Sequence, residues 1–165
     1  MEMEKEELGR YFLAIVRIGM GWLLLWSFFD KVFGLGFSTP AGGGWIDGVS
    51  PSSYISYVAS GPLADFYISL GGNVFVDILM MAGLLCIGGT LIFGFASKIC
   101  TAAFIAFMLI MFSLQLPPND NPIINYKVLL AVAMLAIYYM GGFEKLSIYN
   151  WYKELAIVRR FPILE

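Results

Sequence analysis

The sequence predicts an all-α protein, an integral membrane four-helix bundle with short interfacial helices in its outer loop. Two observations lead to this fold class. Apolar residues make up 59% of the 165 residues and charged residues only 13%, against about 45–50% and 25% in soluble globular domains. In addition, four stretches approach the roughly 20 apolar residues with which a helix crosses a bilayer. We therefore treat 1–165 as a single membrane domain.

Four spans are expected, at about residues 11–33, 74–97, 99–116 and 123–140. The first contains Arg17 and closes on Asp30-Lys31, the second has Asp77 near its start, and the fourth has Lys127 near its start. The third span carries no charge. Glycine and alanine are frequent in the first three spans. Small residues let helix backbones approach closely, so this pattern predicts a tightly packed bundle.

Residues 34–73 form the predicted outer loop, which is long enough to fold on its own. Ser50-Pro51 and Ser60-Gly61-Pro62 both precede apolar residues at helical spacing. Proline in the first turn together with this spacing predicts two short amphipathic helices at the membrane interface. The prolines of 117–122 predict a tight turn between the third and fourth spans. The tail, 141–165, mixes aromatic and basic residues and is expected at the cytoplasmic interface.

The charges set the predicted orientation and exclude one class of partner. Seven of the ten Lys and Arg residues lie in the N-terminal segment, at Lys98 or in the tail. Basic residues are retained on the cytoplasmic side of a membrane, so both termini are expected to be cytoplasmic. The net charge is −2, which gives no reason to expect nucleic-acid binding.

The chain contains no histidine and only two cysteines, Cys86 and Cys100. It therefore offers no histidine for haem, zinc or a catalytic relay. Two thiols are also too few for an iron–sulfur cluster, which takes about four ligands. We expect no haem, metal or iron–sulfur cluster bound by this chain alone, and we interpret both cysteines as small apolar side chains.

Charged and phenolic groups at the ends of the spans are the candidate ligand-binding residues, because ionisable groups at membrane depth are costly. Asp30, Lys31, Asp77 and Lys127 are expected at one depth beneath the outer loop, with Tyr126 beside them. Two acids and two bases at one level can pair into a neutral network. Such a network is either a polar site that takes a ligand or a set of interfacial groups that reach water.

Arg17 is a separate case. By helix rise it lies about 10 Å inside the cytoplasmic end of its span, on a face expected to point into the bundle. Its expected partners are polar groups such as Thr101 or Tyr138, or backbone carbonyls. A structural role and a ligand-binding role both stay open.

Several short motifs together resemble the DoxX/DoxD family of small four-span membrane proteins of bacteria and archaea. The first-span pattern is an Arg, a Gly and a closing Asp-Lys pair, matched here by Arg17, Gly21 and Asp30-Lys31. Further matching segments are 25–37, Thr39-Pro40, 45–48, 61–63, Asn121-Pro122 with Tyr126, and Ile157-Val158. The resemblance covers nearly the whole chain and implies a multi-pass protein of a prokaryotic cell membrane.

The resemblance implies a role at the quinone pool. DoxD-type proteins are subunits of thiosulfate:quinone oxidoreductase, whereas many DoxX relatives have no established activity. One departure concerns the fourth span, where relatives often read Asn-Pro-x-x-Asp-Tyr-His and this chain has Asn121-Pro122-Ile-Ile-Asn125-Tyr126-Lys127. A titratable pair is thereby replaced with an amide and a cation, so any proton handling by that pair would differ here.

Two functions follow as expectations. The first is a membrane subunit of a quinone-linked oxidoreductase with thiosulfate as an implied donor, in which the lysines and Arg17 hold the ligand and Asp30 or Asp77 accepts a proton. The second is a non-catalytic accessory subunit of a larger respiratory complex. A transporter is the weaker third, because four spans show no inverted repeat. Expected partners are membrane lipid and either other membrane subunits or a second copy of the chain. Substrate, oligomeric state and catalytic competence stay open.

Overall fold

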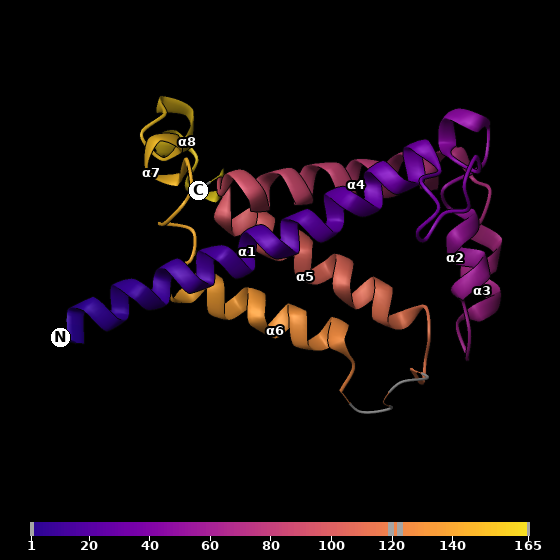
Figure 1. Ribbon diagram of the computed structural model, residues 1–165, viewed down its shortest axis with the longest axis horizontal. Helices are drawn as coiled ribbons and strands as arrows, with labels where there is room; N and C mark the ends of the chain where they lie inside the picture. Colours follow the sequence, from indigo (N-terminus) through magenta and orange to yellow (C-terminus); the bar gives the residue numbers. More distant parts are fainter. Residues whose placement is uncertain (1, 119–120, 122–123, 165) are drawn as a thin grey trace.

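The structure, a computed structural model, describes residues 2–118, 121 and 124–164, and every regular element in this part of the chain is helical, as predicted. Four helices form the body of the molecule: α1 (Glu2–Phe33), α4 (Val74–Phe93), α5 (Ser97–Ser113) and α6 (Tyr126–Tyr139). They run alternately in opposite directions, so the start of α1 lies at the end of the molecule opposite the outer loop (Figure 1). Because successive helices run in opposite directions, helix ends that are far apart in the sequence lie at the same end of the molecule.

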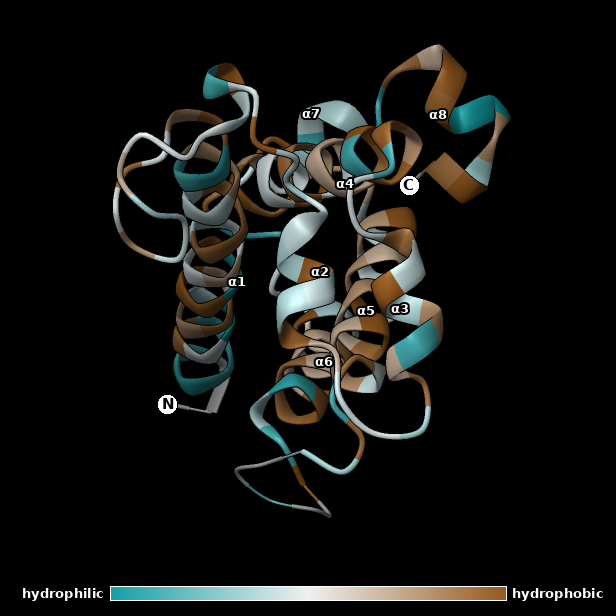
Figure 2. Ribbon diagram, turned by 90° about the vertical axis from the view of Figure 1, so that its right-hand side faces the viewer, coloured by the Kyte–Doolittle hydropathy of each residue, from teal (hydrophilic) through white to brown (hydrophobic). Residues whose placement is uncertain are grey.

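Two of the four helices, α1 and α4, are long and apolar enough to cross a membrane. With 17 and 14 residues, α5 and α6 fall short of the roughly 20 residues that a perpendicular crossing takes. Apolar, brown residues cover much of the α1 and α5 ribbons in the view from the outer-loop end (Figure 2). The all-helical class is therefore confirmed, whereas the four-span membrane bundle stays a prediction.

The helices begin and end at different residues from the predicted spans. α1 begins at Glu2 rather than near residue 11, because the residues before the apolar stretch are mostly strong helix formers. α4 ends at Phe93 rather than 97, since Gly94 adopts a left-handed conformation with φ 67°, a usual way to end a helix. α5 ends at Ser113 rather than 116.

α6 begins at Tyr126, where the Asn125 side chain accepts a hydrogen bond of 2.8 Å from the backbone N–H of Lys127. Asparagine is a preferred residue at this capping position. The predicted start at 123, and residues 119, 120 and 122 of the predicted turn, lie outside the described residues.

Close packing of α1 against α4 depends on two of the predicted small residues. A Cβ atom added to Gly21 would lie 2.8 Å from the Gly88 carbonyl oxygen, closer than real Cβ contacts. The prediction of backbone approach is confirmed for this pair. At Gly19, Gly83 and Gly89 an added Cβ would meet nothing within 4 Å, so these glycines are not needed for that approach.

The outer loop folds over the end of the bundle. It contains η1 (Trp45–Asp47), α2 (Ser53–Val58) and α3 (Ala64–Leu70), which confirms the two predicted short helices. The backbone N–H of Ser60 donates to the Leu114 carbonyl at 2.8 Å and thereby fixes the loop to the end of α5. Toward the opposite end lie α7 (Tyr149–Tyr152), α8 (Ala156–Arg160) and η2 (Pro162–Leu164) (Figure 1). The outer loop thus covers the end of the bundle at which the candidate charged residues were predicted.

Candidate functional site

Arg17 is completely buried, as its helix face predicted, and each hydrogen bond that it makes with the described residues goes to a backbone carbonyl. Its guanidinium donates to Leu91 at 2.5 Å, to Ile92 at 3.4 Å, and to three residues of the segment after α6, namely Gly142, Lys145 and Leu146, at 2.9–3.1 Å. The suggested side-chain partners are therefore wrong, and the hydroxyl of Thr101 is buried with no hydrogen-bond partner among the described residues. Arg17 joins three segments of the fold and lies away from the other candidates.

Asp30 is also completely buried, and its carboxylate holds the start of the outer loop. It accepts four hydrogen bonds from residues 37–39: the backbone N–H groups of Phe37, Ser38 and Thr39 at 2.8–3.2 Å, and the Ser38 hydroxyl at 2.7 Å. A carboxylate with this many donors stays ionised and fixes the loop that donates them. Its role is to return the chain over the end of α1.

The Asp77 carboxylate likewise holds a second part of the outer loop in place through hydrogen bonds. Its Oδ1 accepts a hydrogen bond from the Ser50 hydroxyl at 2.7 Å and another from the Ser52 backbone N–H at 2.7 Å. Ser52 is itself buried, and its hydroxyl accepts a bond from Gly72 N–H at 3.0 Å. Asp77 therefore positions the segment that leads into α2.

The predicted neutral network of two acids and two bases does not form. Asp30 and Asp77 make their hydrogen bonds with the outer loop, and in the described part of the chain neither has an ion pair with Lys31 or Lys127. Loop N–H and hydroxyl donors satisfy the carboxylates first because they are adjacent and need no long side chain to be ordered. Lys31 and Lys127 instead line the cavities beneath the loop.

Lys31 is 8% exposed, and its ammonium lies 4.6 Å from the centre of the Tyr54 ring. This is a cation–π arrangement between the end of α1 and α2 of the loop. Partial burial raises the pKa of the Tyr54 phenol above its usual value of about 10. A neutral phenol and an ammonium therefore face each other beneath the loop.

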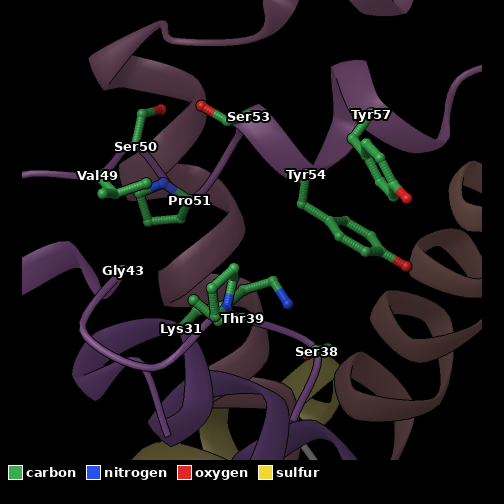
Figure 3. A pocket seen from close by; sticks show the side chains of 11 residues that line it. Lys31, Ser38, Thr39, Gly43, Val49, Ser50, Pro51, Ser53, Tyr54 and Tyr57 are labelled. Atoms are coloured by element: carbon green, nitrogen blue, oxygen red, sulfur yellow. The ribbon is translucent and has the colours of Figure 1, made fainter. Parts of the chain in front are cut away.

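Two pockets meet at this pair. The outer pocket has a volume of about 360 Å³ and lies between the end of α1 and the loop, with Lys31, Ser38, Tyr54 and Tyr57 in its wall (Figure 3). The inner pocket, of about 380 Å³, lies among α1, α4, α5 and α6. Lys31, Ser38 and Tyr54 line both pockets.

The inner pocket has a polar end and an apolar wall. Its polar end brings together Lys31, Lys127, Tyr54 and Tyr126. The Lys127 ammonium lies 5.3 Å from the Tyr126 ring centre and donates to the Gln115 amide oxygen at 3.3 Å. The apolar wall consists of Leu23, Leu24, Trp26, Phe37, Met80, Leu84, Phe107, Met108, Met111 and Leu130. Such a cavity fits an amphiphile with a hydrogen-bond-accepting head.

The structure brings together three of the six candidate residues, Lys31, Tyr126 and Lys127, and places Arg17, Asp30 and Asp77 in the framework. Sequence reasoning missed Tyr54 and Trp26 as pocket residues. Tyr54 belongs to the predicted short helix after Pro51, and an aromatic residue in such a helix carries no sequence signal that distinguishes a pocket wall from an interfacial anchor. Comparison of the chain with protein-family models, curated proteins and solved structures gave no match.

Proposed function

We propose that this chain is an integral membrane subunit of a quinone-linked oxidoreductase, and that the inner pocket receives the quinone head. The observation behind this proposal is the amphipathic inner pocket, in which two ammonium groups, two phenols and the hydroxyls of Ser27 and Ser38 accompany a mostly apolar wall. The resemblance of the first-span motif to DoxX/DoxD proteins also supports a quinone-linked function. Two helices with the length and hydropathy of membrane spans agree with access from lipid.

The chemistry of a quinone head fits the residues of this pocket. Its two carbonyl oxygens accept hydrogen bonds, for which Lys31, Lys127 and Tyr126 supply donors. Its ring packs against aromatic side chains such as Trp26, and its apolar tail matches the leucine and methionine wall. When two electrons reach the ring, negative charge builds on the oxygens, and fixed ammonium groups stabilise that charge. The electrons come from a donor or from a partner subunit, with thiosulfate the donor that the resemblance suggests.

The proposed placement in the membrane follows the helix directions. Arg10 and Lys145 lie at the end opposite the outer loop and form ion pairs with Glu144 and Glu7 at 2.8 and 2.7 Å. With these basic residues on the cytoplasmic side, the outer loop and the polar end of the inner pocket lie toward the other face. A quinone then enters from the bilayer between the helices.

The test is quinone-analogue binding to the purified chain, followed by quenching of tryptophan fluorescence, to which Trp26 contributes. A hydrogen bond from a charged donor is worth about 1.5–3 kcal/mol, so Lys127→Met is expected to raise Kd about tenfold or more. Lys153→Met is the matched control. The Lys153 ammonium also lies against a tyrosine ring, 5.4 Å from the centre of the Tyr149 ring, but Lys153 does not line the inner pocket. Equal Kd values for the two variants would refute the proposed head site.

A second function, a non-catalytic accessory subunit, is favoured by the roles of the carboxylates. Asp30 and Asp77 are bonded to the loop, and no Asp or Glu lines the inner or outer pocket among the described residues. The expected proton acceptor is therefore not at the cavity. Purification in mild detergent, followed by thiosulfate-dependent quinone reduction with and without any co-purified polypeptide, separates the two functions. Activity only in the presence of the partner supports the accessory role.

A further inference from the structure

The outer pocket contains a buried cation, Lys31, that forms no ion pair within the described part of the chain. Lys31 is 92% shielded from solvent, and its ammonium lies against the face of the Tyr54 ring. The neighbouring Asp30 carboxylate attracts it but forms no ion pair with it in the described part of the chain. Figure 3 shows the Lys31 ammonium inside the cavity, directed toward the Tyr54 ring. No hydrogen bond or ion pair joins Lys31 to another described side chain.

A buried ammonium without a counter-ion is costly, and a ring face replaces only part of its lost hydration. Asp30 is its sequence neighbour, yet the Asp30 oxygens accept four bonds from residues 37–39. Asp77 is bonded to Ser50 and Ser52 in the same way. Both carboxylates thus hold the loop that forms the pocket wall, and neither makes a hydrogen bond or ion pair with the Lys31 ammonium among the described residues.

We propose that the outer pocket binds an oxyanion, supplied either as a free inorganic ion or as the phosphate of a lipid headgroup, with Lys31 as its charge partner. The wall offers hydroxyl donors that the fold does not use: Ser53 and Tyr57 line the pocket, and neither hydroxyl has a partner in the described part of the chain. An ammonium and hydroxyl groups in the wall of one pocket are donor types that oxyanions bind.

The volume and the position of the pocket agree with this ligand class. About 360 Å³ is ample for a tetrahedral oxyanion and leaves room for an attached group. Its wall comes only from residues 31–57, that is, from the end of α1 and the loop. The outer pocket is therefore formed by the loop and the end of α1, whereas the inner pocket lies among the bundle helices. The proposal does not depend on quinone binding in the inner pocket.

Variants that separate the two pockets test the proposal. Lys31→Met removes the charge and keeps the apolar stem, and Lys127→Met is the matched control because Lys127 lines the inner pocket alone. Binding of inorganic sulfate to delipidated protein in neutral detergent is measured by equilibrium dialysis at constant chloride. We expect Lys31→Met to raise the Kd for sulfate about tenfold or more, and Lys127→Met to leave it unchanged.

A second arm distinguishes the source of the oxyanion. Native mass spectrometry of the protein extracted from membranes containing phosphatidylglycerol reports retained anionic lipid. Lipid retained by the wild type and by Lys127→Met, but lost in Lys31→Met, assigns the site to a headgroup phosphate. Sulfate binding without retained lipid assigns it to a free oxyanion.

The proposal is overturned if the wild type binds neither sulfate nor anionic lipid, or if Lys31→Met binds as the wild type does. Should Lys31→Met fail to fold, the double variant Ser53→Ala with Tyr57→Phe takes its place, because both residues are exposed and their loss does not disturb the core. The double variant is expected to bind several-fold more weakly, and unchanged binding would again overturn the proposal. Loss of quinone binding in Lys127→Met with intact sulfate binding keeps the two proposals distinguishable.

Discussion

Replacement of Arg17 by methionine is expected to destabilise the bundle more than any other single loss of charge. The guanidinium donates five hydrogen bonds to backbone carbonyls that come from the end of α4 and from the segment after α6. α1 itself carries Arg17, so one side chain connects three parts of the chain. Its plane also lies 5.3 Å from the Phe143 ring centre.

The magnitude follows from what the substitution leaves behind. A hydrogen bond from a charged donor contributes about 1.5–3 kcal/mol, but five bonds from one group are not additive. Each buried carbonyl that is left without its donor costs about 1–3 kcal/mol, and Arg17→Met removes the donor from five of them at once. We therefore expect Arg17→Met to lower the free energy of unfolding by at least about 3 kcal/mol. Arg17→Lys should lose less, because an ammonium keeps the charge and three donors but not the planar fork.

The assay is reversible unfolding in mixed detergent micelles, followed by helical circular dichroism. Arg10→Met is the control, because Arg10 lies on the same helix and pairs with Glu144 at 2.8 Å, with both side chains 44% exposed. Exposed pairs of this kind contribute about 0–1 kcal/mol. If Arg17→Met unfolds at the same denaturant activity as Arg10→Met, the assignment of Arg17 as a structural connection is wrong.

Three further predictions concern positions outside the pockets or at their wall. Gly94→Ala should destabilise by about 1–2 kcal/mol or more in the same unfolding assay, because φ is 67° and the new methyl would overlap the Arg17 guanidinium, whereas Gly89→Ala should be neutral. Gly21→Ala should separate α1 from α4 and lower the unfolding midpoint, and an unchanged midpoint would contradict the close approach to Gly88. In an alkaline absorbance titration, Tyr54→Phe should remove a phenol that titrates above pH 10. Because the fold favours its neutral form, the stability from Tyr54 is complete below pH 10 and is lost as the pH rises through the folded pKa.

The sequence was sufficient for the helical class and for the location of the charged end. Runs of apolar residues with few charges predict helices directly, because a helix satisfies all backbone hydrogen bonds within the segment itself. The helix ends were less predictable. Gly94 is one of several glycines in the predicted second span, and only its left-handed backbone shows that it ends α4.

The candidate residues divided in a way that spacing does not reveal. Lys31 and Asp30 are adjacent in sequence, yet one faces two pockets and the other faces loop donors. A residue's position on a helix gives its depth but not the path of a forty-residue loop, and that path decides which group receives the hydrogen bonds. Arg17 illustrates the same limit, because its acceptors lie 74 or more positions away along the chain.

The departure at the start of α6 takes on a specific meaning in this structure. Asn125 is 2% exposed and caps α6 through its side-chain oxygen, a function that aspartate and asparagine share. An amide at this position therefore keeps the helix start while it removes a negative charge next to Lys127. The lysine itself adds an ammonium to the polar end of the inner pocket. An uncharged capping residue and an ammonium therefore stand side by side at this end of the cavity, and an ammonium favours ligands whose heads accept hydrogen bonds or carry negative charge.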